Sequence, residues 1–383
     1  MIHRISNLSE SRSFLLLGPR GTGKSTLLSQ WAKEKSVILY DLLDPAVEAT
    51  LHHKPQTIID NWLAEKHDWI IIDEIQKIPK LLDVVQLGIS KYKINFALTG
   101  SSARKLRRGS SNLLGGRASE FHLHPLTFLE LGKKFDLIDV LSYGSLPEIH
   151  QLSKIEKERA LYSYVSTYLK EEILVEQIIR KIDPFRKFLE VAAQMNGKIL
   201  NYAKIGNDSN VEQKSVARYF QILHDTLIGV FLEPYHHSVR KRQSQKAKFY
   251  FFDCGVTRAL QNNLKIALTD QTFQYGDLFE QFVILEIMRL NDYYEKRFKF
   301  SYLVTKDGVE IDLIIERPGE RIVLIEIKSS AENNTDHAKH LKLLEPEFKK
   351  PEMYVINNAA KPALIDGVNY VNWSSGIKQL FKN

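Results

Sequence analysis

The segment Gly18-Pro-Arg-Gly-Thr-Gly-Lys-Ser25 decides the fold of the first part of the chain. It satisfies the pattern GxxxxGK[ST], follows an apolar strand candidate at Phe14–Leu17 and precedes a helical stretch over Ser25–Lys33. In such a loop, backbone N–H groups surround phosphates, the lysine reaches the terminal phosphates and the last hydroxyl ligates magnesium. A plain glycine turn is the alternative, which the strand, loop and helix order disfavours. The predicted nucleotide-binding residues are Gly18, Pro19, Arg20, Gly21, Thr22, Gly23, Lys24, Ser25 and Thr26.

A second motif, Trp69-Ile-Ile-Ile-Asp73-Glu74, places two acidic residues after an apolar strand candidate. We expect Asp73 to join the magnesium shell and Glu74 to orient and deprotonate the attacking water. A solvated acidic turn is the alternative, and the presence of the phosphate loop disfavours it. Because the chain has no Asn-Lys-x-Asp guanine-reading motif, the predicted cofactors are ATP and Mg²⁺.

Two further residues are predicted to act at this site. The strand that ends in Leu98-Thr-Gly-Ser-Ser102 offers Ser101, to within two positions, as a group that senses the terminal phosphate. A basic, glycine-flanked loop behind it closes with Gly115-Gly-Arg117. An arginine at the edge of such a site stabilises transition-state charge, so Arg117 is a catalytic candidate alongside Lys24 and Glu74. A solvated surface arginine is the alternative, and the sequence leaves open whether Arg117 serves its own subunit or a neighbour.

The hydropathy pattern divides the 383 residues into four parts. Residues 1–135 alternate amphipathic stretches with four apolar strand candidates, at Phe14–Leu17, Val37–Leu42, Trp69–Ile72 and Asn95–Leu98, which predicts a parallel α/β sheet. Residues 136–182 are helical and are interpreted as a lid. Residues 183–253 run helix, short helix, turn, helix and two strands, the order of a winged helix. Residues 254–383 read as a second α/β domain.

The composition excludes a disordered tail, a collagen-like fibre and a coiled coil. The apolar fraction of 44% and the charged fraction of 26% are those of globular chains, and one cysteine, Cys254, permits no disulfide framework. We therefore expect Cys254 to be a small core residue and the protein to be cytoplasmic, with no signal peptide and no membrane span. The formal charge of +7 favours a polyanionic partner without specifying one.

These motifs together resemble a family of bacterial and archaeal AAA-type ATPases with a carboxy-terminal winged helix and a restriction-endonuclease-like domain. The resemblance covers nearly the whole chain. It implies that residues 1–135 form a P-loop NTPase core of the AAA type with ATPase activity, and it leaves the biological role open. The matching segments are GPRGTGKS, IIIDEIQ, LTGSSARKL, GGR with HPLTFLEL, YGSLPE at 143–148, YFFDCG at 250–255, GDLFEQFVILEI at 276–287, GVEIDLII and IEIK.

The winged-helix region carries the candidate DNA contacts. A recognition helix is expected over Lys214–Thr226, and the basic wing tip spans His236–Lys248. Basic groups there are suited to phosphates and carry little sequence information. The alternative is a rigid lid or protein-docking module with a solvated basic wing. The predicted DNA-binding residues are Lys214, Arg218, Arg240, Lys241 and Arg242.

The last domain offers four groups in the order of the PD-(D/E)xK nucleases. Glu280 lies on a predicted helix, Asp312 on one strand, and Glu326 and Lys328 two residues apart on the next strand. Side chains two apart on a strand face the same side, so a turn between the strands can bring these groups together. We expect Asp312, Glu326 and Glu280 to hold magnesium and Lys328 to position water or neutralise developing charge. A domain kept only for its fold and for partner binding is the alternative.

The leading hypothesis is an ATP-hydrolysing, DNA-associated protein whose nucleotide state positions the winged helix and a metal-dependent nuclease-like domain. The rival is a nucleotide-dependent switch that recruits a protein partner and cuts nothing. A homo-oligomer is compatible with both.

Overall fold

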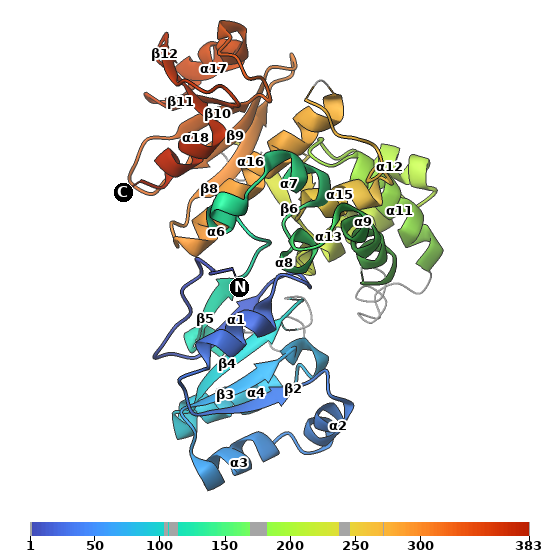
Figure 1. Cartoon of the computed structure of the whole chain (residues 1–383), viewed down its shortest axis with the longest axis vertical. Coiled ribbons are helices and arrows are strands. Elements are labelled where there is room, and N and C mark those ends of the chain that lie inside the picture. The colour runs from blue at the N-terminus through green and yellow to red at the C-terminus, as the bar shows by residue number, and fades with distance from the viewer. Residues whose placement is uncertain are drawn as a thin grey trace. The chain divides into compact units, whose positions relative to one another are not determined.

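The computed structural model describes residues 2–102, 106, 114–168, 182–236, 246–270 and 272–382. The chain divides into two compact units (Figure 1). The first unit contains residues 1–126, 146–148 and 221–228, and the second contains 127–145, 149–220 and 229–383. Arg240, Lys241 and Arg242, predicted to contact DNA, lie outside the described residues.

The first unit is built on a five-stranded sheet in which every pair is parallel, in the order β2-β3-β4-β1-β5. This confirms the predicted parallel α/β sheet. The four strands expected from the sequence all form, and β5 is an additional edge strand. The strands are β1 (Phe14–Leu17), β2 (Val37–Asp41), β3 (Trp69–Asp73), β4 (Asn95–Gly100) and β5 (Ser119–His122).

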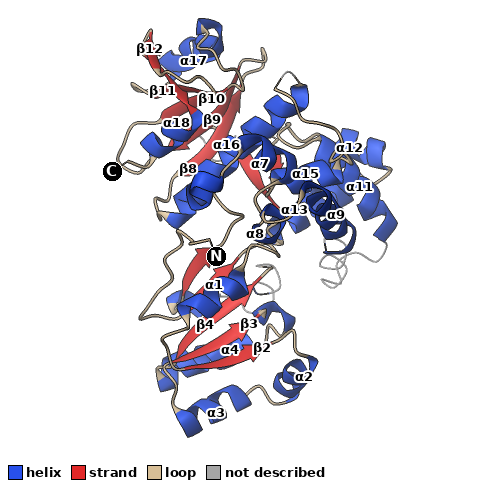
Figure 2. Ribbon diagram, in the orientation of Figure 1, coloured by secondary structure: helices blue, strands red, loops and turns tan. Residues whose placement is uncertain are grey.

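Helices cover both faces of this sheet (Figure 2). Successive strand residues point to opposite faces, so Leu15 and Leu17 enter one apolar cluster and Phe14 and Leu16 enter the other. The central strands are buried on both sides, which explains why they read as unbroken apolar runs. The helices are α1 (Lys24–Trp31), α2 (Pro45–His53), α3 (Thr57–Glu65) and α4 (Leu81–Leu87).

The second unit contains a mixed eight-stranded sheet in the order β12-β13-β11-β10-β9-β8-β6-β7. Helix α17 packs on one face, and α16 and α18 lie on the other (Figure 2). The strands are β6 (Gly229–Pro234), β7 (Lys248–Phe251), β8 (Lys299–Val304), β9 (Glu310–Glu316), β10 (Val323–Ile327), β11 (Glu352–Asn357), β12 (Ala363–Ile365) and β13 (Val368–Asn372).

The remaining helices precede or flank this sheet. Among the described residues they are α6 (Phe128–Leu131), α7 (Leu137–Tyr143), α8 (Pro147–His150), α9 (Lys154–Ser163), α11 (Ile182–Gln194), α12 (Tyr202–Ser209), α13 (Gln213–Asp225), α15 (Cys254–Leu260), α16 (Phe273–Tyr293), α17 (Lys339–Leu344) and α18 (Trp373–Leu380). The order α11, α12, α13, β6, β7 is the one predicted for a winged helix. Strand β6, however, also pairs with β8, so hydrogen bonds cross the predicted boundary after residue 253. The four-part division stays a prediction.

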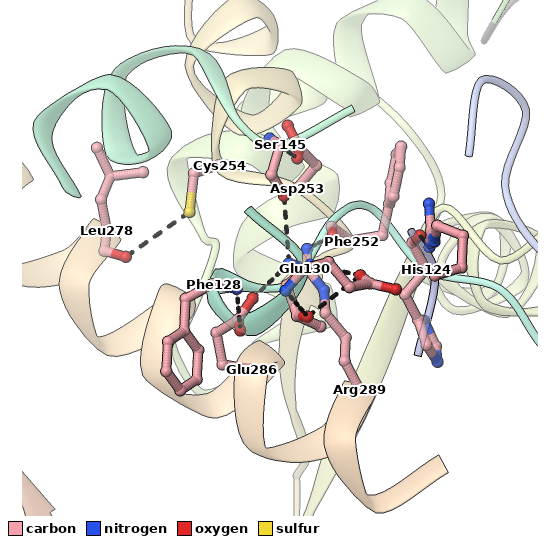
Figure 3. Close-up of polar contacts among 12 residues, drawn as sticks. His124, Phe128, Glu130, Ser145, Phe252, Asp253, Cys254, Leu278, Glu286 and Arg289 are labelled. Atoms are coloured by element: carbon pink, nitrogen blue, oxygen red, sulfur yellow. Dashed lines mark hydrogen bonds and ion pairs between the residues drawn. The ribbon is translucent and has the colours of Figure 1, made fainter. Parts of the chain in front are cut away.

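Two motifs about 110 residues apart in sequence lock together inside the second unit (Figure 3). The buried carboxylate of Asp253 caps α15 and accepts the N–H of Ser145 at 2.9 Å. Gly144 has φ 75°, and a Cβ there would lie 1.8 Å from Asp253 Oδ1. Only glycine fits this contact, which accounts for Gly144 in YGSLPE and Asp253 in YFFDCG. Cys254 beside them is buried and unbridged, as predicted.

Helix α16 is fixed by a buried ion pair (Figure 3). Glu286 accepts from Arg289 at 2.8 Å and from the N–H of Phe128 at 3.0 Å, while Arg289 also donates to the carbonyl of Phe252 at 2.9 Å. These contacts join α16 to α6 and to the end of β7. In the part of the chain that the structure describes, no helix is long and apolar enough to cross a membrane.

Candidate functional sites

The phosphate loop has the backbone that its motif requires. Gly21 and Gly23 adopt φ values of 83° and 89°, and Gly23 is the N-cap of α1. A Cβ on Gly18 would lie 2.2 Å from the carbonyl oxygen of Leu123, so only glycine fits there. The loop joins β1 to α1 and presents backbone N–H groups at a helix N-terminus, the arrangement that binds phosphate.

The predicted magnesium residues of this site meet directly. Ser25 Oγ donates to Asp73 Oδ2 at 2.6 Å, and the Thr99 hydroxyl donates to the other oxygen of Asp73. Lys24 is buried, with its ammonium donating to the carbonyls of Gly18 at 2.8 Å and Pro19 at 3.3 Å. The parallel register Asp41↔Asp73 places these groups at the carboxyl edge of the sheet, where ligands of open α/β sheets bind. The residues present therefore fit a phosphate chain with Mg²⁺.

Glu74 is held by a small polar network. It adopts a left-handed backbone, φ 60°, and its N–H donates to Thr99 Oγ1 at 3.0 Å. Its carboxylate accepts from the Gln76 side chain and from Ser101 Oγ, the latter at 3.2 Å, and Gln76 also donates to Ser101 at 2.9 Å. Ser101 thus lies beside Glu74. The sequence patterns did not identify Gln76, although it stands two residues after Glu74 and is buried.

Arg117 lies at the other end of the sheet. In the register of β1 and β5, Leu17 pairs with His122, and Arg117 stands before the first residue of β5. The offset of five residues between Arg117 and His122 corresponds to about 17 Å along the strand. Arg117 is exposed, and its guanidinium lies near Gly115. Arg117 and the phosphate loop of the same chain therefore lie at opposite edges of the sheet.

One residue near the loop gave no sequence signal. Arg4 is buried, and its guanidinium donates to the carbonyl of Thr22 in the loop at 3.1 Å and to that of His124 at 2.5 Å. It therefore ties the amino-terminal segment to the phosphate loop and to the end of β5. A single arginine outside any motif could not have been identified from the sequence.

Three of the four predicted nuclease-type groups gather in the second unit. Asp312 on β9 and Glu326 on β10 are both buried, and Lys328 Nζ lies 2.6 Å from Glu326 Oε1. Asp312 Oδ2 accepts the N–H of Ile327 at 2.7 Å. Burial, and then the charges of Glu326 and Glu280, raise the pKa of Asp312 well above its usual range. Burial likewise raises the pKa of Glu326, although Lys328 acts in the opposite direction.

Glu280 is engaged differently from what the sequence predicted. Its carboxylate accepts from Tyr250 Oη at 2.6 Å and lies 3.4 Å from Lys248 Nζ. Among the described residues, no group of three or more His, Cys, Asp and Glu side chains is placed to hold a metal ion. The expected shell of three carboxylates is therefore not assembled in this structure, because two residues of β7 hold Glu280.

Lys248 also departs from its sequence interpretation. It was expected at the basic wing tip, facing phosphates, and instead it begins β7 with only 4% of its surface exposed. Its ammonium lies 2.6 Å from Glu310 Oε1 as well as close to Glu280. Burial acts to lower the pKa of Lys248, but the charges of Glu280, Asp312 and Glu310 outweigh it and raise that pKa.

The remaining carboxylates suit a divalent cation. Glu326 Oε2 is buried and has no hydrogen-bond partner among the residues described. A buried carboxylate oxygen without a partner is costly, and two acids that share a buried site disfavour each other's ionised form. A cation bound between Asp312 and Glu326 would remove both penalties. Carboxylate oxygens are also the ligands that Mg²⁺ and Mn²⁺ prefer.

The predicted recognition helix forms as α13. Lys214 and Arg218 are exposed on it, whereas Val216, Phe220 and Leu223 are buried. The helix therefore buries its apolar side chains and exposes these two basic ones. The basic side chains are accessible to a polyanion, and DNA binding itself stays a prediction.

Sequence comparison finds a family match for the region that contains the phosphate loop. Residues 10–132 match a family described as an AAA domain. These residues are similar to AAA domains and are named the AAA domain here. The AAA domain contains the phosphate loop, the acidic pair, Ser101 and Arg117. Residues 134–267 and 275–375 match two families, each described as a domain of unknown function.

Relatives occur in bacteria and archaea. An uncharacterized protein of Mycobacterium tuberculosis is 27% identical over 311 residues, which cover 80% of this chain and 68% of the relative. An uncharacterized protein of Haemophilus influenzae is 22% identical, with 93% and 92% covered. One of Methanocaldococcus jannaschii is 25% identical, with 82% and 74% covered.

Solved structures show weaker likeness. A replication initiator DnaA bound to AMPPCP and single-stranded DNA aligns with a TM-score of 0.30 and 16% identity, covering 56% of this chain and 83% of that one. A STAND protein with a tetratricopeptide repeat sensor from Pyrococcus horikoshii aligns with a TM-score of 0.22 and 12% identity, covering 75% and 46%. Likeness at these TM-scores supports no statement about function.

Proposed function

We propose that this chain hydrolyses ATP in its AAA domain, acts on DNA, and carries in its second unit a divalent-metal site that cleaves phosphodiesters. The observation that supports the ATPase proposal is the group of Ser25, Asp73 and Thr99 beneath the phosphate loop, with Glu74 next in sequence. Bound ATP with Mg²⁺ supplies an electrophilic terminal phosphate whose charge the metal partly neutralises. The proposal also places the protein in the cytoplasm, in keeping with its one unbridged cysteine.

Each residue of the AAA domain has a defined task in this proposal. Lys24 leaves the carbonyls of Gly18 and Pro19 and neutralises the terminal phosphates. Glu74 accepts a proton from the attacking water, and Gln76 and Ser101 hold its carboxylate in position until then. Arg117 acts on the site of a neighbouring copy, since the sheet separates it from its own loop. This last step makes the active form a homo-oligomer.

Steady-state ATP hydrolysis by the full chain tests the proposal. We expect Lys24→Ala to lose most activity and Glu74→Gln to keep ATP binding, seen as thermal stabilisation, while turnover falls about 100-fold or more. Lys33→Ala, an exposed lysine just after α1, is the matched control and should match the parent. Unchanged turnover in Lys24→Ala would exclude hydrolysis at this loop.

The second part of the proposal concerns the carboxylates of β9 and β10. The unpartnered Glu326 Oε2 beside buried Asp312 supports a metal there. A bound metal would supply Lewis acidity and a water of lowered pKa. Lys328, 38% exposed at the rim, is suited to stabilise negative charge that develops on a phosphate.

Cleavage of single-stranded and duplex DNA, with and without ATP, tests this second part. Magnesium or manganese should support cleavage and calcium should not, because calcium binds carboxylates but is a poorer Lewis acid. Asp312→Ala should lose metal and activity together, whereas Lys328→Ala should keep the metal and lose only cleavage, since an ammonium is not a ligand. Asp307→Ala, an exposed carboxylate just before β9, is the control.

A second candidate function rests on Glu280. Because Tyr250 and Lys248 hold its carboxylate, the second unit also suits a nucleotide-dependent switch that recruits a protein partner without cutting. In that case no DNA is cleaved under any nucleotide condition. ATP hydrolysis would persist and would change the affinity for the partner.

A further inference from the structure

Lys248 occupies an unusual position for a lysine. It is buried at the start of β7, and its ammonium lies 2.6 Å from Glu310 Oε1 and 3.4 Å from Glu280 Oε1. Lysines are almost never fully buried unless they are paired. These contacts therefore make it part of the carboxylate site and not of the basic wing.

The acidic groups around Lys248 explain why a lysine is buried at the start of β7. Glu280, Glu310, Asp312 and Glu326 contribute four acidic groups, and Lys328 pairs with Glu326 at 2.6 Å. Lys248 faces the others and is the second cation of the cluster. Without it, Lys328 would be left to offset these acids with a single charge, which is unfavourable.

We infer that Lys248 is a counter-cation built into the proposed metal site: together with Tyr250 it holds Glu280 on β7, and it competes with a divalent metal for the carboxylates. The inference rests on the proposed function, because it assumes that Asp312 and Glu326 bind the metal. It makes Lys248 a positioning residue, which weakens metal binding where a ligand would strengthen it. Metal binding requires Glu280 to leave Lys248 and Tyr250 if it is to join the shell.

Electrostatics predicts whether metal affinity rises or falls when Lys248 loses its charge. A lysine and a divalent metal that share one set of acids repel each other, and solvent screens this repulsion less in a partly buried site than at the surface. Removing the ammonium eliminates the repulsion and leaves Glu280 and Glu310 in need of a cation. Metal affinity should therefore rise when Lys248 loses its charge. A merely structural lysine predicts the reverse, because a damaged site binds metal less tightly.

Calorimetric titration of the full chain with Mn²⁺ tests the inference without relying on activity. We expect Lys248→Met to bind Mn²⁺ about tenfold more tightly or better, given the size of such charge interactions. Lys248→Arg, which keeps the charge, should stay near the parent. Lys299→Met on β8 removes an exposed lysine and is the matched control. Mn²⁺ should also raise the melting temperature of Lys248→Met more than that of the parent.

A second variant leaves the charge unchanged. Tyr250→Phe removes the hydroxyl that donates to Glu280 at 2.6 Å and should tighten Mn²⁺ binding by about threefold to tenfold, the value of one hydrogen bond. If Lys248→Met does not fold, Tyr250→Phe decides the question. Unchanged or weaker binding in the folded variants overturns the inference. Asp312→Ala separates this result from the proposed function: if that variant binds Mn²⁺ as the parent does, the metal lies elsewhere and the proposed function itself fails.

Discussion

Replacing Glu286 by leucine should destabilise the second unit more than any surface substitution. Glu286 lies on α16 with 1% of its side chain exposed, and it is the acidic partner of Arg289, which is 5% exposed. The same carboxylate accepts the N–H of Phe128. Leucine has a similar volume, so the main loss is polar. Helix α16 also carries Glu280, and the change therefore bears on the proposed metal site.

Two costs set the expected loss in the free energy of unfolding. Removing one partner of a buried ion pair typically costs about 3–5 kcal/mol, because the other charge stays buried. Arg289 keeps the carbonyl of Phe252 at 2.9 Å and Ser145 Oγ at 3.3 Å, which favours the lower end of that range. The N–H of Phe128 loses its acceptor, which adds about 1 kcal/mol or more. We expect a loss of roughly 4 kcal/mol in the free energy of unfolding.

Fluorine NMR of protein labelled with 5-fluorotryptophan provides the assay. Trp373 is the tryptophan of the second unit and packs against Phe128 at 5.1 Å between ring centroids, whereas Trp31, Trp62 and Trp69 belong to the first unit. Following the Trp373 resonance through urea unfolding therefore reports on the second unit by itself. The midpoint should fall with little change in the slope.

The control is Glu345→Gln, which breaks the exposed pair with Lys342. Surface pairs contribute about 0–1 kcal/mol, so its midpoint should hardly move. If Glu286→Leu loses no more stability than Glu345→Gln, then the Glu286 and Arg289 pair does not fix α16 and the reasoning is refuted.

Three further predictions concern a turn, a pH dependence and DNA binding. Gly144→Ala should destabilise the second unit by about 3 kcal/mol or more, because its Cβ would overlap a buried carboxylate, whereas Gly132→Ala, also at positive φ but with nothing within 4 Å, should cost about 1–2 kcal/mol by the same urea assay. Burial raises the pKa of Glu286 from 4.5 to about 7, so the folded state binds this proton more tightly than the unfolded state. As the pH rises from 4.5 through 7, the stability of the parent relative to Glu286→Gln should therefore fall by on the order of 3 kcal/mol. A relative stability that grows with pH would contradict the raised pKa of Glu286. Replacing Arg240 and Arg242 by alanine should lower the log-log salt slope of duplex DNA binding by about one for each of these arginines that neutralises a phosphate, and an identical slope would mean that the wing does not touch DNA.

The AAA domain was predictable from the sequence because its chemistry is local. The phosphate loop needs glycines, a lysine and a hydroxyl within eight consecutive residues, between a strand and a helix that the adjoining residues predict. The parallel strands are buried on both faces and read as apolar runs. Ser25 and Asp73 come together because both lie at the carboxyl edge of the parallel sheet.

The sequence could not show which side chains far apart in the chain come into contact. The amino acids around Lys248 suggest a basic wing, and only the tertiary structure brings this lysine to Glu310 on β9 and Glu280 on α16. Arg117 follows the phosphate-site motifs closely in sequence, yet the parallel pairing of β5 with β1 puts it at the opposite edge of the sheet. The residue types determined by themselves which chemistry is present, since phosphate and metal chemistry depend on particular functional groups. Which of those groups share a site was decided by strand order and burial, since a side chain's partners and charge depend on what surrounds it in three dimensions.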